Sequence, residues 1–329
     1  MTPRTRVIVV AGAAAALAAG GTVALAVVTG GHEGRTDEAQ QPPAGAPPLV
    51  LDLGVRVDPE ARALRRAERL YSQKRRVAAG RIFGRYQSPG ARIGAAFSAW
   101  PNTSLAKLER LALERRRDSL VLLHLGFANL WAGHTAEATS AFREAARAQP
   151  DSASAQRADD ALHPNFPPGQ PFFVPTFGPP AGLGDLPPPA QLAVLAREAR
   201  RRDVHSKLLY GLALQRLGHR LSARRQYDAA AKLAPRDPEA FVAAAVARFD
   251  KSRPAEAFSR LGPLTRRFPR APTVRFHLGL LLLWLARAQP GSVDEGKRQL
   301  RLAQAEEPGS PLAREAKLLL ARLANAPKK

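Results

Sequence analysis

The sequence predicts an all-α fold in which helical hairpins stack one after another, and two observations lead to this prediction. Four stretches carry a small residue, a Phe, Tyr or Leu four residues later, and a Pro twelve residues after the small residue; such fixed spacing is typical of repeat architectures. Aromatic residues make up only 6% of the chain and Ala is abundant, which favours close helix packing over a sheet. The four sets are Ala138, Phe142 and Pro150; Ala223, Tyr227 and Pro235; Ala257, Leu261 and Pro269; and Gly296, Leu300 and Pro308.

Residues 1–31 are expected to form a transmembrane signal-anchor. The stretch from Val7 to Thr29 contains 23 residues without a charge and follows Arg4 and Arg6. This length spans a bilayer as a helix, and the basic flank predicts an amino terminus inside and an extracytoplasmic repeat array. The alternative is a cleavable signal peptide with a small-residue site at 24–26, after which the protein would be secreted.

Residues 32–49 are expected to form a Pro-rich linker that holds the array away from the membrane. Residues 50–118 follow, and small and bulky residues recur in them at hairpin spacing, although less regularly than later in the chain. We therefore expect two divergent helical hairpins here. The residues that carry the spacing are Leu70, Ala79 and Phe83 in the first hairpin and Gly94, Phe97 and Ala106 in the second.

The clearest unit covers residues 119–152. With Ala138 in the twentieth place of this 34-residue unit, Gly126 takes the eighth place and Phe142 the twenty-fourth. Small residues at the eighth and twentieth places let two antiparallel helices approach, and the bulky residue fills the remaining gap. The unit resembles a tetratricopeptide repeat (TPR), and the chain is identified as a member of that class of bacterial, membrane-anchored or exported repeat proteins. The resemblance implies a right-handed α-solenoid.

The same phase extends over the carboxyl-terminal half. Residues 204–237 repeat the fit with Gly211, Ala223 and Tyr227, whereas residues 238–271 fit more weakly. A fourth unit at 272–309 has a lengthened turn, so its second helix begins late. Residues 310–329 are expected to hold a capping helix and a tail, because a solenoid needs a polar cover at its open end.

Residues 153–203 are expected to form one more hairpin, split by an insertion at residues 163–189. The insertion contains ten prolines and four phenylalanines, too many prolines for helix or sheet. Such a segment is extended and could lay its phenylalanines against an apolar wall of the array. Two possibilities stay open at this point: the insertion docks in the groove of the array, or it is a mobile arm that recruits a partner.

The charge of the chain limits its partners. Fifty Lys and Arg residues against 28 Asp and Glu residues give a net charge of +22, which favours anionic membrane lipids or wall polymers. Nucleic acid is not expected, because aromatic residues do not alternate with the basic ones as a stacking platform requires. No cysteine occurs, which excludes disulfides and thiolate metal ligands.

The sequence does not indicate an enzyme. It contains no Gly-x-Ser-x-Gly, no His-Glu-x-x-His and no Gly-rich dinucleotide turn. The segment 291–297 has the glycine and lysine spacing of a phosphate loop, but Arg298 stands where Ser or Thr would hold magnesium. We therefore expect no catalytic residue, no cofactor and no metal site.

The TPR resemblance implies a binding site on the concave face, which the first helix of each hairpin lines. Carried over by repeat phase, two Trp residues fall at the same place in separate units, and their neighbours are apolar. This face departs from the Lys- and Asn-lined faces that clamp an acidic carboxyl terminus. The expected partner-binding residues are Leu123, Phe127, Leu130, Trp131, Leu208, Leu212, Arg216, Val246, Phe249, Phe276, Leu280, Leu283 and Trp284.

The sequence thus predicts a noncatalytic interaction scaffold at the extracytoplasmic face of a bacterial membrane. Its partner would be a peptide or helix of another protein, bound in the apolar concave groove, unless the insertion at 163–189 occupies the groove itself. The alternative is electrostatic binding to anionic envelope polymers or lipids through basic helices. Strong salt dependence would distinguish the second mode from the first.

Overall fold

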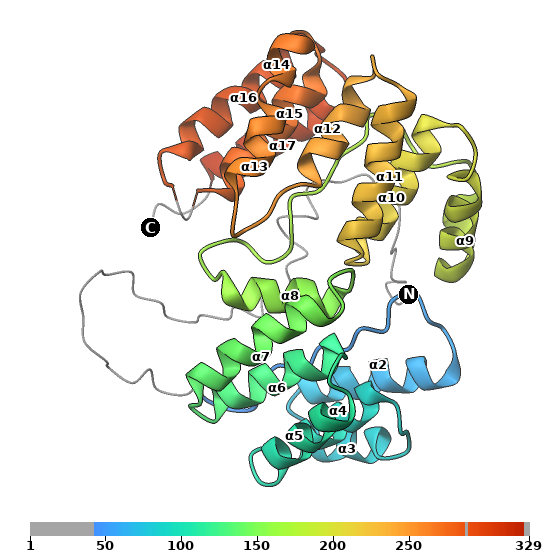
Figure 1. The fold of residues 1–329 in the computed structure, drawn as a ribbon. Coiled ribbons are helices and arrows are strands. Elements are labelled where there is room, and N and C mark those ends of the chain that lie inside the picture. The colour runs from blue at the N-terminus through green and yellow to red at the C-terminus, as the bar shows by residue number, and fades with distance from the viewer. Residues whose placement is uncertain (1–42, 287–288, 326–329) are drawn as a thin grey trace. The chain divides into compact units, whose positions relative to one another are not determined.

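Helix is the only regular structure in the part of the chain that the structure describes (Figure 1). The structure is a computed structural model and describes residues 43–286 and 289–325. For these residues the prediction of an all-α fold is confirmed. They divide into two compact units, which we call the N-terminal unit (residues 43–164) and the C-terminal unit (residues 165–325).

Each unit is built from consecutive helices, most of which are joined by short turns. The N-terminal unit contains α2 (Pro59–Ser72), α3 (Arg76–Phe83), α4 (Pro89–Ser98), α5 (Ser104–Glu114), α6 (Ser119–Trp131), α7 (Thr135–Ala148) and α8 (Ala153–Leu162). The C-terminal unit contains the 3-10 helix η1 (Leu183–Asp185), α9 (Pro188–Glu198), α10 (Val204–Arg216), α11 (Arg220–Leu233), α12 (Pro238–Val246), α13 (Ala255–Leu261), α14 (Leu264–Arg267), α15 (Pro272–Trp284), α16 (Ser292–Glu306) and α17 (Pro311–Ala324).

Aspartate caps the first helix of several hairpins. The side chains of Asp58, Asp118, Asp203 and Asp237 accept hydrogen bonds from backbone N–H groups in the first turns of α2, α6, α10 and α12. These caps satisfy donors that the helix itself cannot pair and place a negative charge at the positive end of the helix dipole. Aspartate in the sequence therefore marks where these four hairpins begin.

Glycine makes the turn within the two clearest hairpins. Gly133, between α6 and α7, has φ of +87°, and Gly218, between α10 and α11, has φ of +83°. Side chains with a Cβ rarely adopt this left-handed conformation, so glycine here allows a tight reversal after the first helix. Both glycines occupy the fifteenth place of their units.

The two helices of a hairpin meet through glycine and an aromatic ring. A Cβ added to Gly126 of α6 would lie 2.4 Å from the ring of Phe142 on α7, and one added to Gly211 of α10 would lie 2.5 Å from Tyr227 on α11. The ring thus occupies the space that any side chain on the glycine would need. The steric reason inferred from the repeat spacing is confirmed at both positions.

The hairpin of α15 and α16 uses two glycines. A Cβ on Gly279 would lie 3.0 Å from the carbonyl oxygen of Gly296 and 3.0 Å from Leu300. Here the two backbones approach each other directly, and the smaller Leu300 replaces the aromatic ring. The second helix keeps this contact although its turn is longer than in the other units.

The unit at 238–271 departs from the expected hairpin. Its first helix, α12, ends at Val246, and its second helix is divided into α13 and α14. The division falls at Gly262 and Pro263, where proline offers no N–H for a helical hydrogen bond. The weak sequence match of this unit thus corresponds to a broken second helix.

Residues 153–203 were predicted to form one split hairpin, but their two helices pack in different units. Helix α8 packs with α6 and α7 within the N-terminal unit, whereas α9 packs with α10 within the C-terminal unit. Ala155 and Ala158 of α8 are buried, which shows that this helix already has a packed face in its own unit. The two segments therefore close different units.

The predicted transmembrane segment from Val7 to Thr29 lies outside the described residues. In residues 43–286 and 289–325, no helix is both long and apolar enough to cross a bilayer. The signal-anchor therefore stays a prediction.

We expect Gly211→Ala to destabilise the C-terminal unit by about 1–3 kcal/mol, because its new methyl group would overlap the Tyr227 ring. Thermal or urea unfolding of the variant would measure this. Gly291→Ala is a matched control in the same unit, because a Cβ there meets no atom within 4 Å. Equal effects of the two substitutions would show that Gly211 is not required for helix approach.

Candidate interaction site

The first helices of consecutive hairpins form one face in each unit. In the N-terminal unit α2, α4 and α6 are neighbours, and in the C-terminal unit α10, α12 and α15 are neighbours. We call each set a first-helix face. These faces carry the residues that the sequence predicted for partner binding, and an extended segment of the same unit lies on each of them.

The first strap, residues 47–53, covers the N-terminal face. Its residues are alternately buried and half-buried, which is the pattern of an extended chain with one side against a surface. Leu49, Leu51 and Leu53 are on the buried side and join the core formed by the helices. Leu51 lies beside Gly90 of α4, where an added Cβ would contact it at 3.5 Å.

Hydrogen bonds to the main chain hold the first strap. The Tyr71 hydroxyl on α2 donates to the Pro47 carbonyl oxygen at 2.7 Å. The Val50 N–H donates to Nε2 of His124 on α6 at 3.2 Å. The Leu51 N–H donates to Oε1 of Glu68 on α2 at 2.8 Å. The helices thus bind the main chain of the strap as well as its leucine side chains.

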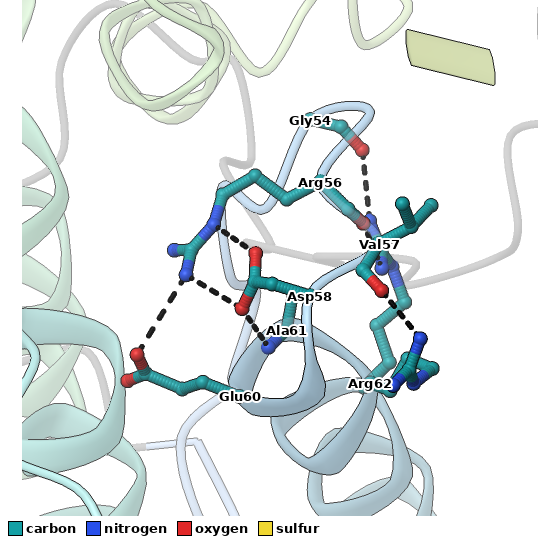
Figure 2. A network of polar contacts seen from close by, with 8 residues as sticks. Gly54, Arg56, Val57, Asp58, Glu60, Ala61 and Arg62 are labelled. Carbon is teal, nitrogen blue, oxygen red and sulfur yellow. Dashed lines mark hydrogen bonds and ion pairs between the residues drawn. The ribbon is translucent and has the colours of Figure 1, made fainter.

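Figure 2 shows how the chain passes from the first strap into α2. The Arg56 guanidinium donates to both carboxylate oxygens of Asp58, at 2.9 and 3.0 Å, and lies 3.6 Å from Glu60. Arg56 lowers the pKa of Asp58 to about 2, and Asp58 also caps α2 through the N–H of Ala61. Because these groups are solvated, the network fixes the direction of the turn more than it adds stability.

The second strap, residues 171–177, covers the C-terminal face and belongs to the predicted insertion. Phe173 is 1% exposed and lies between two rings, with centroids 5.8 Å from Tyr227 and 5.5 Å from His277. Phe177 stacks on His205 at 4.1 Å. The insertion is therefore docked on helices of its own unit, which answers the question that its composition left open.

Hydrogen bonds to the main chain hold the second strap as well. Gln215 of α10 donates from Nε2 to the Pro171 carbonyl oxygen at 2.9 Å. The Val174 N–H donates to Nε2 of His277 on α15 at 2.8 Å, and the Thr176 N–H donates to Oε1 of Glu239 on α12 at 2.8 Å. All three first helices of the unit contribute one of these bonds.

The two histidines accept hydrogen bonds because each holds its proton on the other ring nitrogen. Nδ1 lies 2.7 Å from the Leu120 carbonyl oxygen in His124 and 2.7 Å from the Thr273 carbonyl oxygen in His277. A carbonyl only accepts, so Nδ1 carries the hydrogen and Nε2 is free to receive the strap amide. Burial lowers the pKa of both histidines to about 4, which keeps them neutral at pH 7.

Two carboxyl groups, half-buried Glu68 and buried Glu239, complete the contacts. Burial raises the pKa of Glu68, and the Leu51 N–H together with the charge of Arg157 acts in the opposite direction. Burial also raises the pKa of Glu239, which the Thr176 N–H opposes. Their acceptor oxygens pair with strap amides, so each strap satisfies a polar group that would be costly to leave unpaired.

The predicted partner-binding residues lie on these two faces but are mostly covered. Leu130 and Trp131 of α6 and Leu280 and Leu283 of α15 are half-buried, and Arg216 is exposed at the end of α10. The indole N–H of Trp131 is buried without an acceptor among the described residues. The buried ones are Leu123, Phe127, Leu208, Leu212, Val246, Phe249, Phe276 and Trp284.

Sequence reasoning missed the role of two histidines that hold the straps. His124 and His277 share the sixth place of their units, and both accept a strap amide. The straps carry a signal that could have been found, since Pro47-Pro48-Leu49-Val50 and Pro171-Phe172-Phe173-Val174 share a pattern. The first strap was assigned to a linker and the start of a hairpin instead.

Comparison with known proteins adds little to the description of this chain. No protein-family model matches the chain, and no curated protein matches it. Among solved structures, it is similar to the C-terminal part of a TPR repeat-containing protein from Cytophaga hutchinsonii. That match has 13% sequence identity and a TM-score of 0.28, and it covers 77% of this chain and 98% of the other. Functional inference therefore depends on contacts within this chain.

Stability should fall as the pH is lowered from 6.5 towards 4. In this window the unfolded histidines bind protons that folded His124 and His277 exclude, at a cost of about 1.4 kcal/mol per pH unit for each histidine. Urea unfolding of the wild type and of the double variant His124→Gln, His277→Gln across this range measures the effect.

The raised pKa values of Glu68 and Glu239 act in the opposite sense. Each stabilises below the unfolded pKa, and this contribution is lost as the pH rises through the folded pKa. Both carboxyls remain in the double variant, so its difference from the wild type isolates the histidines. Identical pH profiles would contradict the histidine assignment.

Phe173→Ala should destabilise the C-terminal unit by about 3–5 kcal/mol, because it empties a site enclosed by two rings. Phe172→Ala is the matched control. The Phe172 side chain, next to Phe173, is only half-buried, so its removal should destabilise the unit much less. Differential scanning calorimetry compares them. If both substitutions had the same small effect, the second strap would not be docked in solution.

Proposed function

We propose that this chain is a noncatalytic protein-interaction scaffold whose first-helix faces bind extended segments of a partner protein. One observation carries the proposal: in both units an extended segment lies on this face and donates backbone N–H groups to buried or half-buried side chains. Main-chain hydrogen bonds give affinity for any extended peptide, and side-chain contacts give selectivity. The faces are thus built for the conformation that a partner segment would adopt.

A partner must displace a strap or extend beside it. A tethered strap competes at an effective concentration on the order of millimolar, so a weak peptide would not replace it. Residues at one end of each face stay accessible, namely Leu130 and Trp131 in one unit and Leu280 and Leu283 in the other. These residues supply the first contact from which displacement proceeds.

The proposed location is the extracytoplasmic face of a bacterial membrane, with Val7 to Thr29 as anchor or signal sequence. The support is the uncharged length and its basic flank. Protease added to intact spheroplasts should degrade the described units and leave a cytoplasmic marker protein whole. If these units resist the protease until the membrane is lysed, the proposed location is contradicted.

Site-specific photocrosslinking tests the binding face. A photoreactive side chain at Leu280 should crosslink a partner in native membranes, and excess peptide of residues 166–177 should compete this product away. The same side chain at exposed Arg266 is the control for nonspecific contact. Equal crosslinking at both positions, or a product that the peptide leaves unchanged, would contradict binding on the first-helix face.

Electrostatic attachment to anionic polymers or lipids is the second candidate, and exposed arginines favour it. Arg115, Arg116 and Arg117 lie in the turn after α5, and a second triplet at 200–202 lies in the turn after α9. These two triplets are in turns between helices, whereas Arg62, Arg65, Arg66 and Arg69 lie in α2. Surface charge attraction is screened by salt.

Cosedimentation with vesicles of anionic lipid should then fall steeply between low and physiological salt. The variant with Arg115, Arg116 and Arg117 replaced by Gln should bind more weakly, with its salt dependence reduced. Binding that neither salt nor these substitutions change would exclude this mode.

A further inference from the structure

We propose that the two first-helix faces read one motif, Pro-x-Φ-Val in an extended backbone with Φ as Leu or Phe, and that the partner segment carries it. The inference rests on the proposed function and specifies its ligand. It comes from a correspondence between the two straps, which lie 124 positions apart and contact helices of different units.

The straps align without a gap. Pro47 corresponds to Pro171, Leu49 to Phe173, Val50 to Val174 and Leu53 to Phe177. In both straps the first and third positions of the motif are buried, and the second and fourth are half-buried. An apolar side chain two residues after proline therefore enters the core of each unit.

The backbone contacts follow the same alignment. The proline carbonyl accepts from the first helix of the first hairpin in each unit, through Tyr71 on α2 and through Gln215 on α10. The valine N–H donates to a histidine at the same repeat place, His124 on α6 or His277 on α15. Two unrelated stretches of chain thus form the same pair of hydrogen bonds, through a proline carbonyl and the N–H of a valine three residues later.

Proline and valine each have a physical role in this motif. Proline fixes its own φ near the extended range and biases the preceding residue the same way, so less conformational entropy is lost on docking. Valine favours extended backbone and supplies the N–H that the neutral histidine must receive. A proline at the valine position would remove that donor and leave Nε2 of a buried histidine unpaired.

The residue after valine is not part of the motif. In the first strap Leu51 donates its N–H to Glu68, but Pro175 at the corresponding place in the second strap has no N–H. Glu239 pairs with the next amide, that of Thr176. Selectivity therefore resides in the four residues from proline to valine.

Fluorescent peptides test the motif on the full chain. The second strap is replaced by a Gly-Ser sequence of equal length, and binding of peptides 45–53 and 166–177 to this variant is measured by anisotropy. We expect both peptides to bind with affinities within about tenfold of each other. An ester in place of the Val174 amide should weaken peptide 166–177 about tenfold or more, since it removes only the N–H that His277 accepts.

An ester at Phe172 is the matched control, because its N–H has no partner among the described residues, and it should change affinity less than twofold. If the Gly-Ser variant does not fold, the double variant Phe173→Ala, Val174→Ala is used instead, because it weakens docking of the strap. Peptide binding is then measured as a rise in melting temperature. Binding of peptide 166–177 without binding of peptide 45–53 would overturn the shared motif and leave the proposed function standing. An equal loss of affinity from the esters at Val174 and Phe172 would do the same.

Two further outcomes would also overturn it. If neither peptide binds either variant, the motif and the proposed function both fail. If the wild-type chain dimerises through exchanged straps, as seen by light scattering and by crosslinks between copies, the occupant is a second copy instead of a separate partner. The same peptide measurements therefore separate failure of the motif from failure of the binding face.

Discussion

The structure depends on covering the apolar face that stacked helical hairpins leave open. Hairpins bury the contacts between their own helices, through glycine against an aromatic ring, but their first helices still present leucine, valine and phenylalanine on one side. Exposing this area would cost about 25 cal/mol per Å² of apolar surface. Each unit meets the constraint in the same way, with an extended segment of its own chain whose apolar side chains enter the face.

The buried histidines make this cover specific. A leucine-lined face alone would accept many apolar segments in many registers, because hydrophobic contact has little direction. A histidine with its Nδ1 hydrogen held by a backbone carbonyl presents one acceptor at one place, and only a suitably placed amide satisfies it. The low pKa that burial imposes keeps this acceptor available at neutral pH. The register of the straps and the proposed peptide binding thus depend on the same two histidines.

The sequence predicted the hairpins well because their determinants are local. Glycine at Gly126 and Gly211, rings at Phe142 and Tyr227, and proline between units act within about thirty residues of each other. The straps could not be predicted in the same way. Val50 reaches a histidine 74 residues away and Val174 one 103 residues away, and such distant pairing leaves no periodic mark. The weak fit of residues 238–271 was visible in the sequence, whereas the assignment of α8 and α9 to different units was not.

Hydrogen exchange of the Val50 and Val174 amides tests the central claim most directly, because each amide belongs to an irregular segment and has a histidine as its partner. At pH 7 both should exchange slowly, with protection comparable to that of amides inside α6 and α15, and the protection should fall as the histidines become protonated at lower pH. Exchange at the rate of an unstructured peptide, with the helices still protected, would show that the straps do not cover these faces.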